Sequence, residues 1–257
     1  MTAKEIYNFI QKDVPVNTQE KWDNSGLLVN AGEKQIKKAV VTLDISRDAV
    51  EFAVDFGADI IFSHHPVIFD PLKNLDKNNP VWGLIKNEIS AVCLHTPLDM
   101  AKHGMNEILY YIMKNPLDLK GFEIFEPINP DGTGFGFISN IGIKKDTACV
   151  AKSLKIALKC SDVRYYNSGR IPEKMSVCSG SGASMLEEAY EMGIDTLVTG
   201  DVKQDRWIAA NNLGINLIDC GHYFTENVCL PYLEKLIKSA DSEIIVKRFE
   251  KVPYNLV

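Results

Sequence analysis

Residues 39–66, AVVTLDISRDAVEFAVDFGADIIFSHHP, decide the fold class. The run AVVTLDI is apolar and β-branched, SRDAVEFAVDFG carries apolar residues at helical spacing, and ADIIFS is typical of a buried strand. A strand, a helix and a second strand in this order form a βαβ unit with parallel strands. A further helix around residues 82–87 and a strand ending at residue 94 continue the alternation. The sequence therefore predicts an α/β fold with mainly parallel βαβ units.

The same pattern returns in the second half of the chain. MSVCSG, MLEEAYEMG and IDTLVTG predict another strand, helix and strand. Gly57 and Asp59 precede the buried strand of the first half, and Gly193 and Asp195 precede its counterpart at the same spacing. We therefore predict two similar α/β domains, residues 1–125 and residues 126–257. The stretch PINPDGTGFGF near their junction is typical of a linker or a turn.

Composition excludes several classes of protein. With 257 residues, 46% of them hydrophobic, the chain is long enough to bury a sizeable core. The net charge of −6 argues against a general nucleic-acid binder or a binder of anionic membranes. No apolar run reaches the ~20 residues of a membrane span, and the start lacks a signal-peptide core. The six cysteines form no C-x-x-C pair, so the sequence predicts a cytoplasmic protein with reduced thiols.

Histidines follow the predicted strands of the first half. His64 and His65 come directly after ADIIFS, and His95 follows AVCL, with Asp99 four residues later. Ligands bind at the carboxyl ends of the strands in open parallel sheets. The histidines therefore lie where chemistry is expected, although each could also be a surface or capping residue at a strand end.

The second half repeats this arrangement. His222 follows the strand INLIDCG and Glu226 comes four residues later, so HYFTE echoes HTPLD. Imidazole and carboxylate groups together suit Zn²⁺, Mn²⁺, Fe²⁺, Co²⁺ or Ni²⁺, and a carboxylate can bridge two ions. We expect a two-metal centre in the cleft between the halves, formed by His64, His65, Asp99, His222 and Glu226.

Other segments leave two interpretations open. Asp44 ends a strand at the same sheet edge. It is either a member of the site or an N-cap or turn residue. Asp23 and Asn24 fit a turn or a substrate contact. The run CSGSGAS at 178–184 is either a phosphate-binding loop before a helix or a tight turn.

Six motifs in order resemble those of one family, the Nif-three-like proteins, also called GTP cyclohydrolase I type 2 homologues. They cover nearly the whole chain: WDNSGLLV at 22–29, SHHP at 63–66, HTPLD at 95–99, VCSGSG at 177–182, TGD at 199–201 and GHYFTE at 221–226. The resemblance implies two interlinked α/β domains and a homohexameric toroid, a trimer of dimers, with metal sites facing an internal cavity. It also implies two divalent metal ions per subunit on the five ligands named above, with Glu226 suited to bridging and His95 close by.

The resemblance implies a metal-dependent hydrolase. Metal-activated water would attack C8 of the guanine of GTP and release formate, with Glu226 or Asp99 orienting the water and His95 passing protons. The substrate would be a nucleotide or another small molecule. The alternative is a metal-binding or regulatory protein without turnover, which acts through partner proteins.

Three positions depart from the family pattern. Many relatives carry a histidine at the position of Asp205 and an arginine at that of Phe137, and His103 stands where relatives often have a glycine. If the family residues at these positions contact substrate, the departures put the inheritance of that substrate in question, whereas the expected metal ligands are unchanged.

Overall fold

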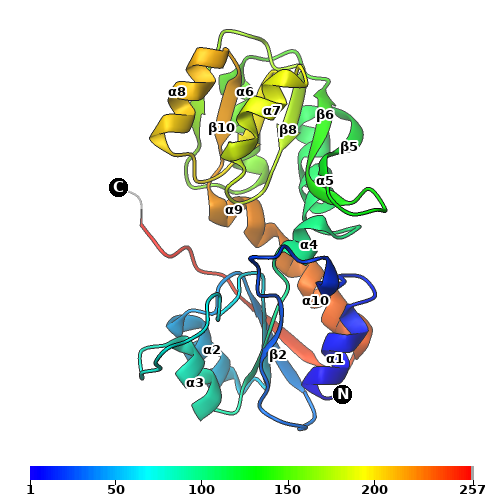
Figure 1. The fold of residues 1–257 in the computed structure, drawn as a ribbon, viewed down its shortest axis with the longest axis vertical. Coiled ribbons are helices and arrows are strands. Elements are labelled where there is room, and N and C mark those ends of the chain that lie inside the picture. Colours follow the sequence, from blue (N-terminus) through cyan, green and yellow to red (C-terminus); the bar gives the residue numbers. More distant parts are fainter. Residues whose placement is uncertain (256–257) are drawn as a thin grey trace. The chain divides into compact units, whose positions relative to one another are not determined.

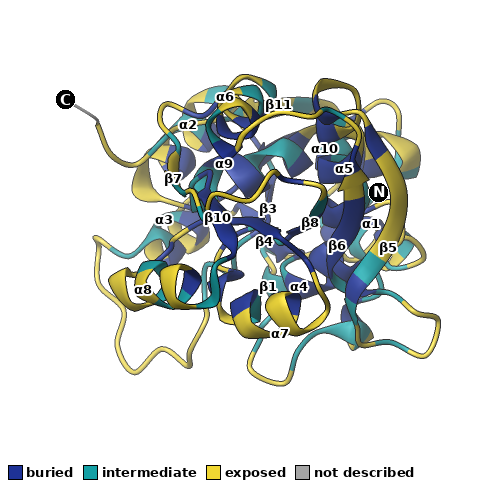
Figure 2. Cartoon of the chain, turned by 90° about the horizontal axis from the view of Figure 1, so that it is seen from above, coloured by how far each residue is buried: buried dark blue, intermediate teal, exposed yellow. Residues whose placement is uncertain are grey.

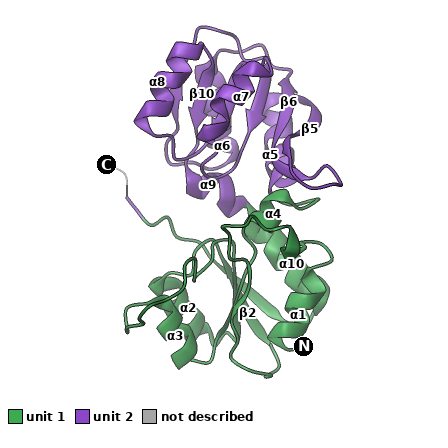
Figure 3. Cartoon of the chain, viewed as in Figure 1, with its two compact units in different colours: residues 1–104, 229–253 green, residues 105–228, 254–257 purple. Residues whose placement is uncertain are grey.

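The computed structural model describes residues 1–255, which form two compact units. Unit 1 comprises residues 1–104 and 229–253, whereas unit 2 comprises residues 105–228 together with Tyr254 and Asn255 (Figure 3). The chain thus leaves unit 1, completes most of unit 2 and then returns.

Unit 1 is a five-stranded sheet with helices on both faces. The strand order is β1-β4-β3-β2-β11, and every neighbouring pair is parallel except β1 with β4. Helices α2 and α3 cover one face of the sheet, and α1 and α10 cover the other (Figure 1). Its elements are α1 (Ala3–Ile10), η1 (Val16–Thr18), β1 (Gly26–Val29), β2 (Lys38–Thr42), α2 (Arg47–Phe56), β3 (Ile60–Ser63), α3 (Pro80–Lys86), β4 (Ser90–Cys93), α4 (Thr96–Met100), α10 (Leu230–Ala240) and β11 (Ile245–Phe249).

Unit 2 is a six-stranded mixed sheet. The order is β5-β6-β8-β9-β10-β7, in which β8, β9 and β10 run parallel and the outer pairings are antiparallel. Helices α7 and α8 pack together, as do α5 and α6 (Figure 1). Its elements are α5 (Met105–Leu117), β5 (Leu119–Pro127), β6 (Gly134–Ile141), α6 (Thr147–Ala157), β7 (Arg164–Tyr166), β8 (Lys174–Val177), η2 (Ala183–Met185), α7 (Leu186–Glu191), β9 (Thr196–Thr199), α8 (Gln204–Leu213), β10 (Asn216–Asp219) and α9 (His222–Glu226), with η3 (Asn227–Cys229) where the chain returns to unit 1.

The predicted α/β fold with two similar domains is confirmed, and the repeat extends to individual hydrogen bonds. Gly57 and Gly193 both adopt left-handed backbone, at φ 71° and φ 70°, where α2 and α7 end. The Asp59 carboxylate accepts hydrogen bonds from the amides of Lys37 and Lys38, at the start of β2. In this Gly-x-Asp motif, the glycine therefore ends the helix, and the aspartate joins the start of β3 to the start of β2.

Asp195 does the same in unit 2. Its carboxylate accepts from the amides of Glu173 and Lys174, at the start of β8, and from the hydroxyl of Thr196. The two aspartates thus fix the register of equivalent parallel strands.

The compact units do not follow the division at residues 125 and 126. Strand β5 crosses that position and pairs with β6, so the segment from Met105 belongs to unit 2. At the other end, β11 pairs in parallel with β2, with Ile245 opposite Lys38. Both differences come from strand pairings between distant residues, which the local pattern of the sequence does not reveal.

Burial follows strand position. Every residue of β3 and β4 is buried, whereas β5, at the edge of its sheet, is largely exposed (Figure 2). The apolar side of α2 packs Val50 and Ala53 against Val40 and Ile61 of the sheet. Within residues 1–255, every helix is too short or too polar to cross a lipid bilayer.

Replacing the strand-tying aspartate of unit 2 tests its structural role. We expect Asp195→Ala to lower the free energy of unfolding by about 1–3 kcal/mol, because two partly buried amides and the buried Thr196 hydroxyl lose their acceptor. Asp55→Ala, on the exposed side of α2, is the matched control and should change stability by less than about 0.5 kcal/mol. Urea titrations followed by circular dichroism measure both; equal stabilities for the two variants would contradict the role assigned to Asp195.

Candidate metal centre

Three imidazoles of unit 1 converge beyond the carboxyl ends of two neighbouring strands. Ser63 at the end of β3 lies opposite Cys93 at the end of β4, so His64, His65 and His95 emerge at the same sheet edge. Their ring centroids are 5.0, 5.3 and 5.5 Å apart. Each ring offers a nitrogen, and these three nitrogens lie within 4.8 Å of one another, close enough to hold a metal ion. The parallel pairing of β3 with β4 thus creates the cluster.

Each of these rings is held through its Nδ1 atom. His64 Nδ1 lies 2.9 Å from the carbonyl oxygen of Leu94, and His65 Nδ1 lies 2.8 Å from Asp44 Oδ1. His95 Nδ1 lies 2.8 Å from Asp23 Oδ1. Because every partner is an oxygen acceptor, Nδ1 donates in each case and Nε2 keeps a lone pair. This is the usual arrangement of metal-binding histidines, whose second nitrogen is bonded to a carboxylate or a carbonyl.

Asp99 joins this cluster from the short helix α4. Its Oδ1 atom lies 3.5 Å from His64 Nε2, and both side chains are buried. The His95 carbonyl accepts from the amides of Leu98 and Asp99, which winds the segment into the helical turn that presents the carboxylate. Three of the predicted metal ligands, His64, His65 and Asp99, therefore come together within unit 1.

Asp23 organises the surroundings of His95. One oxygen accepts from His95 Nδ1, and the other accepts from the hydroxyls of Ser25 and Thr96 and from the Thr96 amide. Burial favours the neutral acid, but the hydrogen bonds from His95 and Thr96 outweigh it and hold the pKa of Asp23 well below its ordinary value. Asp23 is therefore an anion that fixes the tautomer of His95, rather than only a turn residue.

Asp44 is likewise a holder of a histidine. It binds His65, while Ser46 is the N-cap of α2, with its hydroxyl accepting from the Ala49 amide. Asp44 therefore positions the His65 ring and is not the N-cap of α2.

Unit 2 carries a histidine and a carboxylate in direct contact. His222 Nε2 and Glu226 Oε2 are 2.8 Å apart on successive turns of α9, as the spacing in HYFTE predicts. His222 Nδ1 lies 2.8 Å from Asp201 Oδ2. Asp201 has φ 52°, a turn conformation that follows β9. This residue was missed as a site residue, although it ends the TGD motif.

The glycine-rich loop after β8 supports Glu226. The amide of Gly180 donates to the Thr225 hydroxyl, and the amide of Gly182 donates to the Thr199 hydroxyl. Gly180 has φ 63°, and a methyl group on it would overlap Glu226 Oε1 and lie 3.4 Å from His222 Nε2. Two amides that a phosphate would need are therefore bound to threonines, so the loop is a tight turn that holds α9.

The three residues that depart from the family pattern occupy three different environments. Phe137 is fully buried and stacks on Phe122 with ring centroids 5.6 Å apart. Asp205 is exposed and forms an ion pair with Arg206. His103 occupies a turn at φ 65°, a backbone conformation that favours the glycine expected there.

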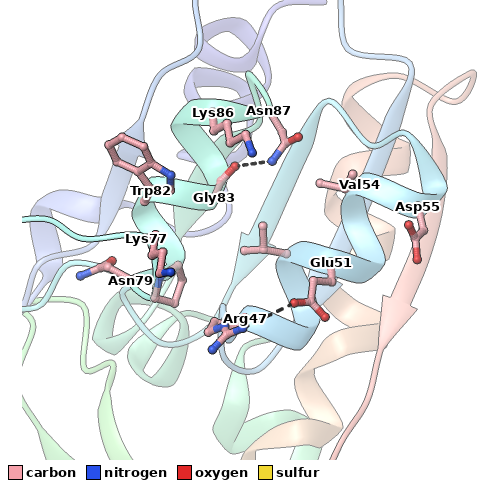
Figure 4. Close-up of a pocket in the computed structure, with 12 residues that line it drawn as sticks. Arg47, Glu51, Val54, Asp55, Lys77, Asn79, Trp82, Gly83, Lys86 and Asn87 are labelled. Atoms are coloured by element: carbon pink, nitrogen blue, oxygen red, sulfur yellow. Dashed lines mark hydrogen bonds and ion pairs between the residues drawn. The ribbon is translucent and has the colours of Figure 1, made fainter.

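A separate pocket of about 330 Å³ lies between α2 and α3 of unit 1 (Figure 4). Its lining mixes the cations Arg47, Lys77 and Lys86 with the anions Glu51 and Asp55. No histidine lines it. The imidazole cluster is therefore distinct from this pocket.

Comparison with known proteins gives consistent matches over the whole chain. Residues 1–253 match the model of the family described as Duf34/NIF3 (NGG1p interacting factor 3). A Methanocaldococcus jannaschii protein named GTP cyclohydrolase 1 type 2 homolog is 31% identical over 256 residues, which cover 95% of this chain and 98% of that protein. A Helicobacter pylori protein named GTP cyclohydrolase 1 type 2 is 28% identical and is covered to 96%, as is this chain. The crystal structure of a hypothetical protein from Staphylococcus aureus has a TM-score of 0.89 at 24% identity, covering 100% of this chain and 99% of that one.

Substitution of Gly180 tests the support that the loop gives to Glu226. Gly193 is the matched control because it has similar backbone, φ 70°, and nothing within 4 Å of an added methyl group. We expect Gly193→Ala to cost about 1 kcal/mol of stability, from backbone strain alone. Gly180→Ala should cost about 1–3 kcal/mol more, since Glu226 must move. Urea unfolding measures both, and equal losses would show that Glu226 does not depend on Gly180.

Proposed function

This chain belongs to the Duf34/NIF3 family, and we propose that it is a metal-dependent hydrolase that binds two divalent ions. The observation that carries the proposal is the repeated anchoring of imidazoles. His64, His65, His95 and His222 each bond an oxygen through Nδ1, which directs Nε2 to a metal ion. In our proposal the ligands are His64, His65 and Asp99 of unit 1 together with His222 and Glu226 of unit 2.

The donor set fits the proposed ions. Imidazole nitrogen and carboxylate oxygen suit zinc, manganese, iron, cobalt and nickel ions. The proposed ligand set contains no thiolate. The two carboxylates, Asp99 and Glu226, are buried, which is costly for an anion unless it is paired with positive charge. Divalent ions would provide that charge.

The chemistry follows from the residues around the proposed ions. When bound, a divalent ion is a Lewis acid that lowers the pKa of a coordinated water from about 15.7 towards about 7. Glu226 would accept a hydrogen bond from the attacking water and orient it. His95, held by the anionic Asp23 with a proton on Nδ1, would accept or deliver a proton at Nε2.

The names of the relatives provide the substrate class. Proteins named GTP cyclohydrolase 1 type 2 and its homologues match over 95–96% of the chain, so we propose that the substrate is a purine nucleotide such as GTP. One water would open the imidazole ring at C8, and a second would hydrolyse the resulting formamide and release formate. The homohexameric ring expected from the motifs remains part of the proposal. Light scattering after gel filtration tests it, with a mass six times that of one chain as the expected result.

Metal content tests the ligand assignment. We expect about two ions per chain in protein purified without chelators, measured by elemental analysis. Glu226→Gln should remove at least one of them, because a neutral amide is a poor bridging ligand. His103→Gln, in an exposed turn, is the matched control and should keep the full content. Unchanged metal in Glu226→Gln would contradict the bridging role, and no metal in the unaltered protein would contradict the proposed function.

Turnover tests the role of His95. We expect His95→Gln to slow GTP-dependent formate release by about 100-fold or more, because a positioned proton carrier is lost, while metal content stays the same. If metal content falls together with turnover, His95 is a ligand instead. If metal-loaded protein releases no formate, the chain binds metal without this reaction.

A further inference from the structure

Two exposed aromatic rings lie beside His95 in unit 1. The ring centroid of Trp22 is 5.8 Å from that of His95, and the ring of Phe69 is 6.4 Å from it. Trp22 and Phe69 are themselves 6.1 Å apart and tilted by only 32°. Their exposed fractions are 57% and 47%, although large aromatic side chains are usually mostly buried. The two rings therefore present exposed aromatic surface next to His95, the proposed proton carrier.

Hydrogen bonds hold this surface in place. Trp22 precedes Asp23, whose carboxylate bonds His95, Ser25 and Thr96. Asn24 comes next. Its side-chain Nδ2 donates to the carbonyl oxygen of Ile68 at 2.7 Å, which ties the loop carrying the neighbouring Phe69 to the same turn. The three consecutive residues of the motif WDN thus have different roles. Trp22 presents its ring, Asp23 holds His95, and Asn24 holds the loop that carries Phe69.

We propose that Trp22 and Phe69 form an aromatic platform on which a planar heteroaromatic ring of the substrate stacks beside His95. Stacking needs a flat π-face and tolerates different ring identities, so the platform selects planarity rather than a particular base. The inference rests on the proposed function for the chemical role of His95 and for a substrate that contains a planar ring. A second copy of the chain covering the rings is the competing explanation.

The structure favours a small ring over a protein partner. Both aromatic rings contact His95 edge-on, at interplanar angles of 76° and 73°, so the platform continues into the imidazole cluster. A protein surface placed there would cover the histidine that the proposed chemistry needs to be accessible.

Fluorescence of Trp22 gives a direct test. The chain has three tryptophans, so in the double variant Trp82→Phe, Trp207→Phe the emission comes from Trp22 alone. We expect adenosine and cytidine 5′-monophosphates to quench it on binding, and ribose 5-phosphate, which has no ring to stack, to leave it unchanged. Quenching by ribose 5-phosphate to the same extent, or by none of the three, would overturn the proposal.

Calorimetry with the same probes tests the two residues separately. Trp22→Ala and Phe69→Ala should each weaken nucleotide binding by about tenfold, the effect of one lost stacking contact, and leave ribose 5-phosphate unaffected. Trp22→Phe should keep more affinity than Trp22→Ala. Trp82→Ala, which removes an exposed tryptophan of α3, is the matched control and should bind normally.

Two further readouts on these samples separate the possible failures. Elemental analysis should give the same metal content in all variants. Absence of metal from the unaltered chain would refute the proposed function, whereas the aromatic platform would still be judged by nucleotide binding. Light scattering should give the same mass for Trp22→Ala as for the unaltered chain. A smaller mass with unchanged nucleotide affinity would overturn the platform and assign the rings to contact with a second copy.

Discussion

The candidate site depends on hydrogen bonds from imidazole Nδ1 to oxygen atoms fixed by the fold. An imidazole ring can rotate and exchange its proton between two nitrogens, so a histidine at a strand end has no defined role by itself. Here the carbonyl of Leu94 and the carboxylates of Asp44, Asp23 and Asp201 each accept a hydrogen bond from one imidazole Nδ1. The rings of His64, His65 and His95 thereby acquire the same tautomer and a lone pair on Nε2, whereas His222 faces a carboxylate oxygen at both ring nitrogens. Strand ends and turns that carry these oxygens therefore set the chemistry of the histidines.

The two units share a pattern, but they use it differently. Both carry a histidine at the start of a short helix and a carboxylate four residues later. In unit 2, His222 contacts Glu226 directly. In unit 1, Asp99 approaches His64 of the neighbouring strand, while His95 turns its Nδ1 to Asp23. The repeated motifs HTPLD and HYFTE thus have similar backbone. The surrounding side chains give His95 and His222 different roles: His95 is a proton carrier in our proposal, and His222 is a metal ligand.

Local pattern was enough to predict the strands and helices that carry the histidines. It was wrong for Gly134–Phe137, which were expected in a linker or turn and belong to β6. Apolar runs and helical spacing located the strands, and the residues after them included His64, His65, His222 and Glu226. The residues that hold the histidines were harder to find. Asp44 and Asp201 lie 21 residues from the histidines they bond, and Asp23 lies 72 residues from His95, so no short motif joins them. The unit boundaries differed for the same reason, because β11 pairs with β2 near the other end of the chain.

The most direct test of this account is a long-range proton–nitrogen NMR spectrum of the imidazoles during zinc titration of the chelator-treated protein. The chain has five histidines, so each ring can be assigned by single substitution. The account predicts that His64, His65 and His95 carry their proton on Nδ1 before zinc is added, that zinc shifts Nε2 of His64, His65 and His222, and that His103 does not respond. A proton on Nε2 instead of Nδ1 in those three rings, or a zinc-dependent shift at Nδ1 in place of Nε2, would contradict it.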